Sequence, residues 1–243
     1  AANNATAEGV KGIISMSLGG GKSNSLNNAV DDAMSNFGVP SVCAAGNSNA
    51  DTATFSPASA PLAVAVGATQ SDDKMASYTN WGPTVDIFAP GTGILAAWLH
   101  GGIKAASGTS MAAPHVSGVL AALWAENDGL TASEAVDMLY CIGTPGVLSP
   151  HPNTPAGHNS PNLLLRGGSA VADDECFDDP NDPDDPTDDP TDGPDDPDDP
   201  TDTDPQTPDP DPEPSPSPSP GPEPECPPFY FEKAGLACPT GYA

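Results

Sequence analysis

The stretch Gly108-Thr109-Ser110-Met111-Ala112-Ala113-Pro114-His115 decides how this chain is interpreted. Gly108 and Thr109 permit a tight turn in which a larger side chain would block access. We place Pro114 in the first turn of a helix, where its missing N–H removes no helical hydrogen bond. The pattern predicts a helix that begins close to Ser110 and buries one face, because apolar residues recur three and four positions apart at Val116, Val119, Leu120 and Leu123.

Ser110 lies where the free N–H groups and the positive end of the helix dipole are concentrated. A negative oxygen that develops there would be stabilised, which favours acyl transfer by a presented serine. The plain alternative is that Ser110 is an N-cap, the commonest use of serine before a helix. A helix that begins near Ser110 carries His115 into its body, so we do not expect this histidine to reach the hydroxyl.

These eight residues resemble the nucleophile motif of the subtilisin-like serine proteases, and the chain up to about residue 168 agrees with that family in order and spacing. The resemblance implies that Ser110 is the catalytic nucleophile. It also implies that Asn47, at the end of a predicted buried strand over 39–45, donates its side-chain amide to the oxyanion beside the Ser110 N–H. By residue type alone, Asn47 is an ordinary turn former.

The resemblance further implies a substrate groove. Ser17, Leu18, Gly19 and Gly20 continue a predicted buried strand that starts at Ile13, and in subtilases such a segment forms a pocket wall and pairs with the peptide backbone. Gly46 is assigned to the same groove. The stretch 47–68 is similar to the proteinase K branch in particular, which implies that Phe55 lines the first specificity pocket and that this pocket takes apolar or aromatic side chains.

Asp86 lies between apolar residues, where an uncompensated carboxylate would be costly to bury. In relatives of proteinase K the matching aspartate binds calcium, and the resemblance implies that the carbonyls of Pro61 and Ala63 complete the site. A salt bridge or a capped loop is the alternative. Calcium would be structural here, and we expect no catalytic cofactor.

Two expected segments do not occur in the 243 residues. Subtilases carry their catalytic aspartate and histidine before the serine, in D-T-G-like and H-G-T-H-like segments. The chain also starts at Ala1, without a methionine, signal peptide or inhibitory prosegment. We therefore expect a fragment, inactive alone, whose partner is the N-terminal half of its own catalytic domain and whose substrates are proteins or peptides.

Composition divides the chain into three regions. The resemblance implies that residues 1–172 are the C-terminal part of a subtilisin-like domain. We expect residues 173–225 to be a disordered acidic linker rich in Asp, Pro and Ser, and residues 226–243 to be a short cysteine-containing tail or the start of a truncated module. The net charge is −28, and 23 of the 34 acidic residues follow residue 172. Such charge argues against nucleic acid as a partner, because phosphates would be repelled.

Five cysteines favour an oxidising compartment and hence a secreted, extracellular protein. Cys226 with Cys238, and Cys141 with Cys176, are candidate pairs. Cys43 is left over and is interpreted as a free thiol in the core. No apolar run reaches the roughly 20 residues of a membrane helix.

The alternation of buried strands with helices predicts an α/β architecture, and the resemblance implies a subtilisin-like three-layer fold with a mostly parallel sheet. A helical core stripe is predicted within 26–37, formed by Leu26, Ala29, Val30, Ala33, Met34 and Phe37. Further predicted elements are a helix opened by the capping box Thr131–Glu134, and a closing segment at 162–165. A serine endopeptidase is the favoured function. Two alternatives stay open: a pseudoprotease that keeps the groove as a peptide-binding module, and a secreted acidic anchoring protein with a protease remnant.

Overall fold

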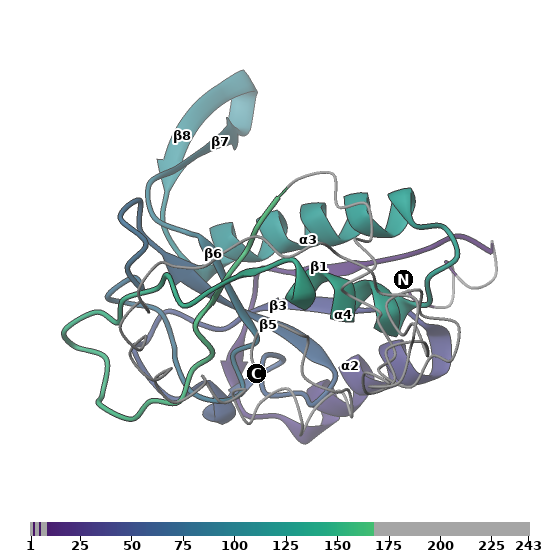
Figure 1. Ribbon diagram of the computed structural model, residues 1–243, viewed down its shortest axis with the longest axis horizontal. Coiled ribbons are helices and arrows are strands. Elements are labelled where there is room, and N and C mark those ends of the chain that lie inside the picture. Colours follow the sequence, from purple (N-terminus) through teal and green to yellow (C-terminus); the bar gives the residue numbers. More distant parts are fainter. Residues whose placement is uncertain (1, 3–4, 6–8, 168–243) are drawn as a thin grey trace, which may run out of the picture.

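The computed structural model describes residues 2, 5 and 9–167 (Figure 1). The acidic linker and the cysteine-containing tail predicted from the sequence lie outside these residues. The described elements, in chain order, are β1 Ile14–Met16, β2 Gly20–Gly21, α2 Asn24–Phe37, β3 Ser41–Ala44, η1 Thr52–Thr54, β4 Phe55–Ser56, β5 Ala63–Thr69, β6 Ile87–Pro90, β7 Ile94–Trp98, η2 Leu99–Gly101, β8 Gly102–Ala106, α3 Thr109–Glu126, α4 Ala132–Cys141, β9 Thr144–Pro145 and β10 Leu163–Leu164.

A six-stranded sheet in the order β1-β3-β5-β6-β10-β9 forms the centre of the fold. All neighbouring pairs are parallel except β9 and β10, which are antiparallel. The predicted α/β architecture with a mostly parallel sheet is therefore confirmed. Among the described strands β1 pairs only with β3, so β1 forms one edge of this sheet.

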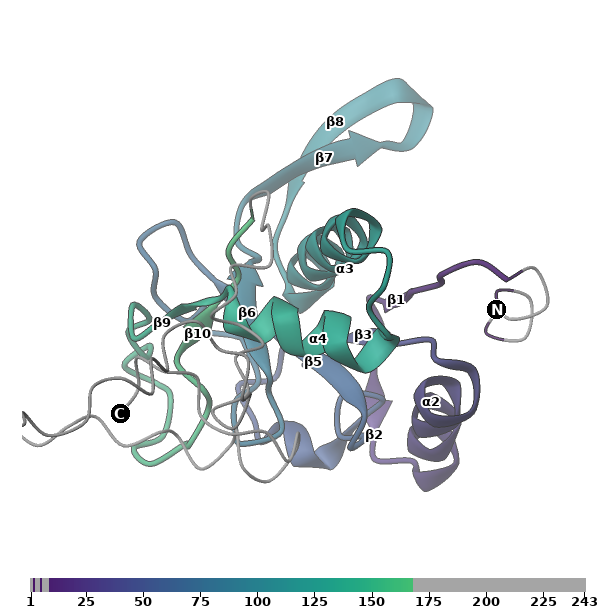
Figure 2. The same cartoon turned by 45° about the vertical axis from the view of Figure 1, so that its right-hand side comes forward.

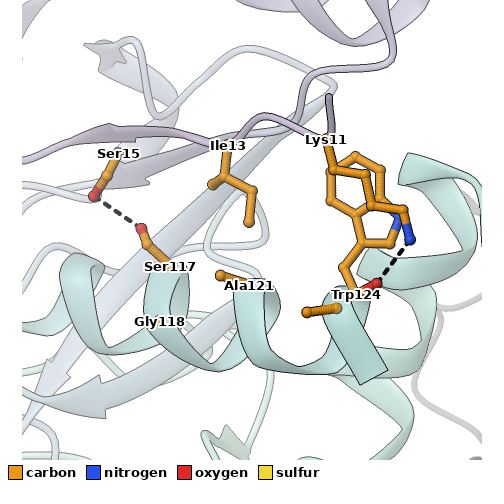
Figure 3. Close-up of a pocket in the computed structure, with 8 residues that line it drawn as sticks. Lys11, Ile13, Ser15, Ser117, Gly118, Ala121 and Trp124 are labelled. Carbon is orange, nitrogen blue, oxygen red and sulfur yellow. Dashed lines mark hydrogen bonds between the residues drawn. The ribbon is translucent and has the colours of Figure 1, made fainter. Parts of the chain in front are cut away.

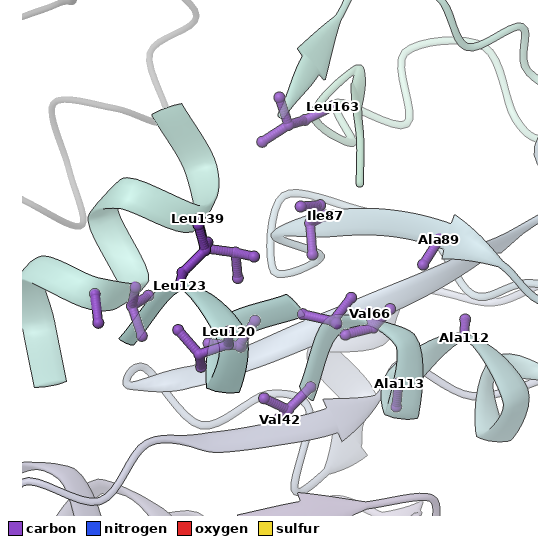
Figure 4. Packing of buried hydrophobic residues seen from close by; sticks show 14 of the residues in the cluster. Val42, Val66, Ile87, Ala89, Ala112, Ala113, Leu120, Leu123, Leu139 and Leu163 are labelled. Carbon is purple, nitrogen blue, oxygen red and sulfur yellow. The ribbon is translucent and has the colours of Figure 1, made fainter. Parts of the chain in front are cut away.

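Helices cover the sheet from both sides, which produces three layers (Figures 1 and 2). Side chains alternate across a strand, so neighbouring residues of the buried strands enter different cores. Val42, Val64 and Val66 pack in the large core under α3 and α4 (Figure 4), whereas Cys43 and Ala65 pack with Val30 of α2 on the opposite face. Burial on both faces explains why these strands read as continuous apolar runs.

Helix α2 confirms the predicted helix but corrects its apolar stripe. Val30 and Ala33 are buried as expected, whereas Ala29 and Phe37 are exposed. Helix α2 packs mainly on β3 and β4, so only a narrow stripe is covered. Asn27, which the apolar pattern omits, is buried there and donates to the hydroxyl of Ser59 at 2.9 Å.

The capping box of α4 forms as predicted. Thr131 accepts from the backbone N–H of Glu134, whose carboxylate in turn accepts from the Thr131 N–H at 2.6 Å. Ala135, Met138 and Leu139 are buried on the apolar side of this helix. No helix within residues 9–167 is long and apolar enough to cross a membrane.

The hairpin of β7 and β8 was not predicted from the sequence. It projects from the body of the molecule in both ribbon views (Figures 1 and 2). The ammonium group of Lys104 lies 4.5 Å from the centre of the Trp98 ring. The large apolar residues exposed on the hairpin are Leu95, Trp98, Leu99 and Ile103.

Candidate active site

The carboxyl ends of the parallel strands gather several predicted site residues at one edge of the sheet. Strand β1 ends just before Ser17, and β3 ends shortly before Asn47. Strand β6 ends before Gly91, whose carbonyl accepts from the N–H of Gly108 at 2.8 Å, so α3 also begins at this edge. In open α/β sheets this edge is where ligands bind.

Ser110 is the second residue of α3, and Gly108 is the N-cap. The alternative that Ser110 is itself the N-cap is therefore wrong. Its half-buried hydroxyl donates to the backbone carbonyl of Ser17 at 3.3 Å. Its backbone N–H meets no acceptor among the described residues, as expected for the first turn of a helix. Ser110 thus combines a presented hydroxyl with an open N–H.

The side chain of Asn47 is exposed and has a defined orientation. Its Oδ1 accepts from the backbone N–H of Thr109 at 2.8 Å and from the Thr109 hydroxyl at 3.0 Å. The same hydroxyl accepts from the N–H of Gly46 at 3.1 Å. Because two donors hold the oxygen, the Nδ2 group of Asn47 is left to point away from Thr109.

Gly108 lies between the two open donors. Its φ is +153°, a conformation that side-chain-bearing residues rarely adopt, and a Cβ built there would lie 3.3 Å from Asn47 Nδ2 and 3.7 Å from the Ser110 nitrogen. The amide of Asn47 and the N–H of Ser110 therefore flank one small space that only glycine leaves open. An oxygen with developing negative charge would be stabilised by two such donors.

The predicted substrate residues Gly19, Gly20 and Phe55 lie close together in the structure. Gly20 pairs with Ser56, and Gly21 pairs with Phe55, in the antiparallel pair β2–β4. Gly19 is so close to the strand that a Cβ on it would lie 3.3 Å from the Ser56 carbonyl oxygen. Leu18 and Ser17 are exposed beside it. The fold brings Phe55 and the glycine segment together on one accessible surface.

Pro114 lies inside α3 and not in its first turn, which corrects the sequence-based placement. A residue at this position would normally donate its N–H to the carbonyl of Ser110, four residues earlier. Proline has no N–H, and the hydroxyl of Ser17 donates to that carbonyl instead, at 2.7 Å. Ser17 and Ser110 therefore exchange two hydrogen bonds, each from a side chain to the other residue's backbone.

No histidine of the described part hydrogen-bonds the Ser110 hydroxyl. His115 lies in the body of α3 as predicted, with Nδ1 2.8 Å from the carbonyl of Met111. His158 pairs with the hydroxyl of Ser160, and burial lowers the pKa of its imidazole. The general base that acyl transfer requires is not supplied by these contacts.

Cys43 is a free, buried thiol, as the sequence predicted. Burial, together with the nearby charge of Asp86, raises the pKa of its thiol to about 12. The thiol is therefore protonated at neutral pH, and Cys43 is no second nucleophile. Cys141 is disulfide-bonded, whereas the predicted pairing with Cys176 involves a residue outside the described part of the chain.

The carboxylate of Asp86 is 1% exposed and accepts from the N–H of Ala65 at 2.7 Å. Pro61 is exposed in the loop before β5, and Ala63 is the first residue of that strand. Residues 9–167 contain no cluster of three side chains that could hold a metal. A calcium site there would therefore depend on backbone carbonyls, whose oxygens are the hard ligands that calcium accepts.

Two features of the site were missed by the sequence analysis. Thr109 orients the amide of Asn47, and Asn80 holds the loop that carries it. The sequence analysis assigned Thr109 only to a turn. Its contact with Asn47 joins residues 62 positions apart, and such a contact leaves no local pattern in the sequence. The sequence indicated Asn80 only weakly. It is a polar residue in a stretch that the apolar pattern assigns to no helix or strand.

The structure is thus an α/β protein with a mostly parallel sheet, which presents a serine hydroxyl and two N–H donors at its carboxyl edge. The sequence matches the profile of the subtilase family over residues 2–142. It is 49% identical over 163 residues to the alkaline proteinase of Hapsidospora chrysogena, an alignment that covers 66% of this chain and 39% of that protein. The chain belongs to the subtilase family.

Two further relatives agree with this assignment. Subtilisin-like protease 1 of Arthroderma gypseum is 43% identical over 163 residues, which cover 67% of this chain and 32% of that protein. A solved structure described as a cold adapted subtilisin-like serine proteinase is 41% identical, with a TM-score of 0.61 over 69% of this chain and 59% of that one. The subtilisin-like fold predicted from the sequence is thus confirmed. The chain spans less than half the length of these curated relatives.

Proposed function

We propose that the complete protein is a serine endopeptidase in which Ser110 attacks the carbonyl carbon of a peptide bond. The Ser110 N–H and the Asn47 amide flank Gly108, and the hydroxyl of the same serine is presented next to Ser17. This arrangement is the observation that carries the proposal. The attack forms an ester to Ser110 after the amine leaves, and water then hydrolyses the ester. Substrate would lie along Leu18, Gly19 and Gly20.

The oxyanion of the tetrahedral intermediate would lie between Asn47 Nδ2 and the Ser110 N–H. Both donors are held in place before the substrate arrives, since Thr109 fixes the oxygen of Asn47 and α3 fixes the backbone of Ser110. Preorganised donors stabilise charge without reorganisation during the reaction. Phe55 and the glycine segment favour an apolar or aromatic side chain in the first specificity pocket.

The proton of Ser110 would pass to a histidine supplied by the N-terminal half of the catalytic domain, which an aspartate orients. The Ser110 hydroxyl donates to Ser17 in the absence of such a base. We expect the 243-residue chain alone to be essentially inactive. Robust Ser110-dependent cleavage by the chain alone would contradict this part of the proposal.

A fluorophosphonate probe tests the nucleophile directly. The native protein is treated with the probe, and the labelled residue is located by peptide mass mapping, with Ser110→Ala as the control. We expect label on Ser110 and a loss of turnover of about 10⁶-fold in the variant, a magnitude taken from the nucleophile of subtilisin. A folded protein that stays unlabelled beside an active protease would favour the pseudoprotease.

The N-terminal half of the domain would join the chain at the free edge of β1. A groove of about 530 Å³ lies there between β1 and α3 (Figure 3). Ile13, Ala121 and Trp124 line it, and the hydroxyls of Ser15 and Ser117 meet at 2.8 Å on its wall. The similar solved structure extends well beyond the matched region, since the match covers 59% of it. A polypeptide strand added to β1 would pair its unused backbone groups.

Hydrogen exchange tests this docking edge. Amides of Ile14–Met16 that do not pair with β3 should exchange slowly in the complete protein and quickly in the 243-residue chain. Equal exchange in both would contradict docking at β1. Amides of β5, which is paired on both sides, serve as the internal reference.

A structural calcium ion held by Asp86 with the carbonyls of Pro61 and Ala63 remains part of the proposal. It is supported by the burial of Asp86, which is 1% exposed. Calcium would offset the desolvation of this carboxylate. Chelation should lower the thermal midpoint of the protein but not that of Asp86→Asn, and an equal response of both would argue for a site elsewhere.

Secretion is likewise proposed, because Cys141 is disulfide-bonded and disulfides persist mainly in oxidising compartments. Recovery of the native protein from culture medium, as opposed to cell lysate, tests this point. Proteins and peptides outside the cell would then be the substrates.

A further inference from the structure

Residues 78–82 run beside the loop that carries Asn47. The backbone N–H of Asn80 donates to the carbonyl of Gly46 at 2.9 Å, and the N–H of Asn49 donates to the carbonyl of Tyr78 at 2.9 Å. The N–H of Trp81 donates to the carbonyl of Ala50 at 3.1 Å. This segment therefore braces the loop along most of its length.

The side chain of Asn80 adds three hydrogen bonds to the same loop. Its Nδ2 donates to the carbonyl of Ala45 at 2.8 Å, while its Oδ1 accepts from the N–H of Ser48 at 2.9 Å and of Ala50 at 3.2 Å. The residue is 0% exposed, so water cannot replace these contacts without a rearrangement. A buried amide with both ends used in this way holds backbone on either side of Asn47.

The contact between Asn80 and the loop is close as well as hydrogen-bonded. Gly46 has a φ of +110°, and a Cβ on it would lie 2.3 Å from Nδ2 of Asn80. Only glycine allows the amide to approach the backbone so closely. The residue before Asn47 is therefore shaped to receive this side chain.

Asn80 is itself anchored to the sheet. The buried hydroxyl of Thr79 accepts from the N–H of Ala68 in β5 at 3.0 Å, and it donates to the carbonyl of Asn80 at 3.2 Å. The neighbouring Tyr78 hydroxyl donates to the carbonyl of Gly91, which also accepts from Gly108. The brace thus connects the Asn47 loop, the sheet and the start of α3.

We propose that Asn80 is a positioning residue that fixes the Asn47 amide for transition-state stabilisation. This inference rests on the proposed endopeptidase function. Asn47 is exposed, and among the described residues its side chain is held by Thr109 alone, through its oxygen. Without the clamp on residues 45–50, the backbone under Asn47 would shift and Nδ2 would leave the space beside the Ser110 N–H.

The test uses Asn80→Ala and Asn80→Asp in the complete protein, with a peptide substrate. We expect a loss of kcat that does not exceed the loss from removing the oxyanion amide, about 100- to 1000-fold in subtilisin, with little change of KM. Asn80→Asp keeps an acceptor for Ser48 and Ala50 but loses the donor to Ala45, so its loss of kcat should be smaller than that of Asn80→Ala if it stays folded. A loss that appears only in KM would overturn the proposal.

Asn162→Ala is the matched control, because Asn162 also pairs its amide with backbone. It accepts from the N–H of Leu148 at 2.8 Å and donates to the carbonyl of Leu148 at 2.9 Å, beside strands β9 and β10. This variant should lose stability without losing kcat. If Asn80→Ala behaves in the same way, its role is only structural and the inference fails.

A double-mutant cycle with Asn47→Ala separates positioning from general damage. If Asn80 acts through Asn47, then Asn80→Ala should cause no further loss of kcat once the Asn47 amide is absent. An equal loss of kcat in the parent and in the Asn47→Ala background would overturn the proposal. The comparison is valid as long as all four proteins of the cycle are folded.

NMR of the Asn47 side-chain amide keeps the inference separate from the proposed function. Its two N–H signals should shift or broaden in Asn80→Ala, whether or not the parent protein turns over substrate. If the parent protein is inactive and unlabelled, but Asn80→Ala shows this NMR change, then the endopeptidase proposal is refuted and the positioning role of Asn80 stands. If the parent protein is active, but Asn80→Ala leaves the Asn47 amide signals unchanged, then only the positioning role of Asn80 is refuted.

Discussion

Helices α2 and α3 begin in chemically opposite ways. Helix α2 has Ser23 as its N-cap, and the Ser23 hydroxyl accepts from the N–H of Leu26 at 3.4 Å. Helix α3 has Gly108 as its N-cap, which provides no side-chain cap at all. The serine that follows, Ser110, lies two positions into the helix, and its hydroxyl faces Ser17 in place of its own backbone.

The difference shows that a serine near a helix start has two distinct uses. In α2 the hydroxyl satisfies an N–H of the first turn and stabilises the helix. In α3 a loop from another strand, through Asn47, satisfies only the N–H of Thr109 and leaves that of Ser110 open. An unsatisfied helix start is tolerated where it can bind an anion, which supports the oxyanion site proposed at the start of α3.

The largest effect within this comparison is expected for Asn47→Ala. The variant removes the amide beside the open N–H of Ser110, so kcat should fall by about 100- to 1000-fold, the range known from subtilisin, at nearly constant KM. Steady-state kinetics of the complete protein measure it. A purely structural role of Asn47 would instead appear as a lower thermal midpoint with unchanged kcat.

Gly108→Ala should affect both activity and stability. The new Cβ would lie 3.3 Å from Asn47 Nδ2, and a backbone held at a φ of +153° is strained for any other residue. Strain of this kind costs about 1–3 kcal/mol. The free energy of unfolding, measured with denaturant, and kcat should both be lower than in the parent protein.

Gly118→Ala is the control in the same helix. No described atom lies within 4 Å of a Cβ at Gly118, so the substitution should stabilise α3 in the 243-residue chain. The gain expected from helix propensity is about 0.5–1 kcal/mol. If both glycine variants behaved alike, the special status of Gly108 would be refuted.

Ser17→Ala should have a smaller effect that depends on Pro114. Losing the Ser17 hydroxyl leaves the carbonyl of Ser110 without its protein donor, because proline cannot replace it. The expected loss is about 0.5–1.5 kcal/mol of unfolding free energy. In the Pro114→Ala background the new N–H can bond that carbonyl, so the same substitution should cost less. Equal losses in the two backgrounds would contradict this account.

Ser23→Ala should have the smallest functional effect. Removing the cap of α2 should lower the unfolding free energy by about 1 kcal/mol and leave kcat unchanged. Thr131→Ala at the start of α4 provides a second capped helix for comparison, since its hydroxyl is part of a capping box. A clear loss of kcat in Ser23→Ala alone would break the distinction between the two kinds of helix start.

Local patterns explain which elements were predictable. The strand predicted over 39–45 and observed as Ser41–Ala44 lies in a mostly apolar run, and the capping box at Thr131 involves residues only three apart, so neighbouring residues carry the whole signal. The hairpin of β7 and β8 escaped prediction. Its exposed Leu95, Trp98 and Ile103 give it an apolar sequence without a buried face.

The sequence by itself determined the family and the alternation of buried strands with helices, and it singled out Ser110 as the proposed nucleophile, because these follow from contiguous residues. The tertiary structure alone decided that Pro114 lies inside α3, that Ser17 replaces its missing N–H, and that Asn80 clamps the loop of Asn47. Each of these contacts joins residues 30 or more positions apart. Their partners are chosen by the folding of the sheet, since hydrogen bonds between distant residues leave no period in the sequence.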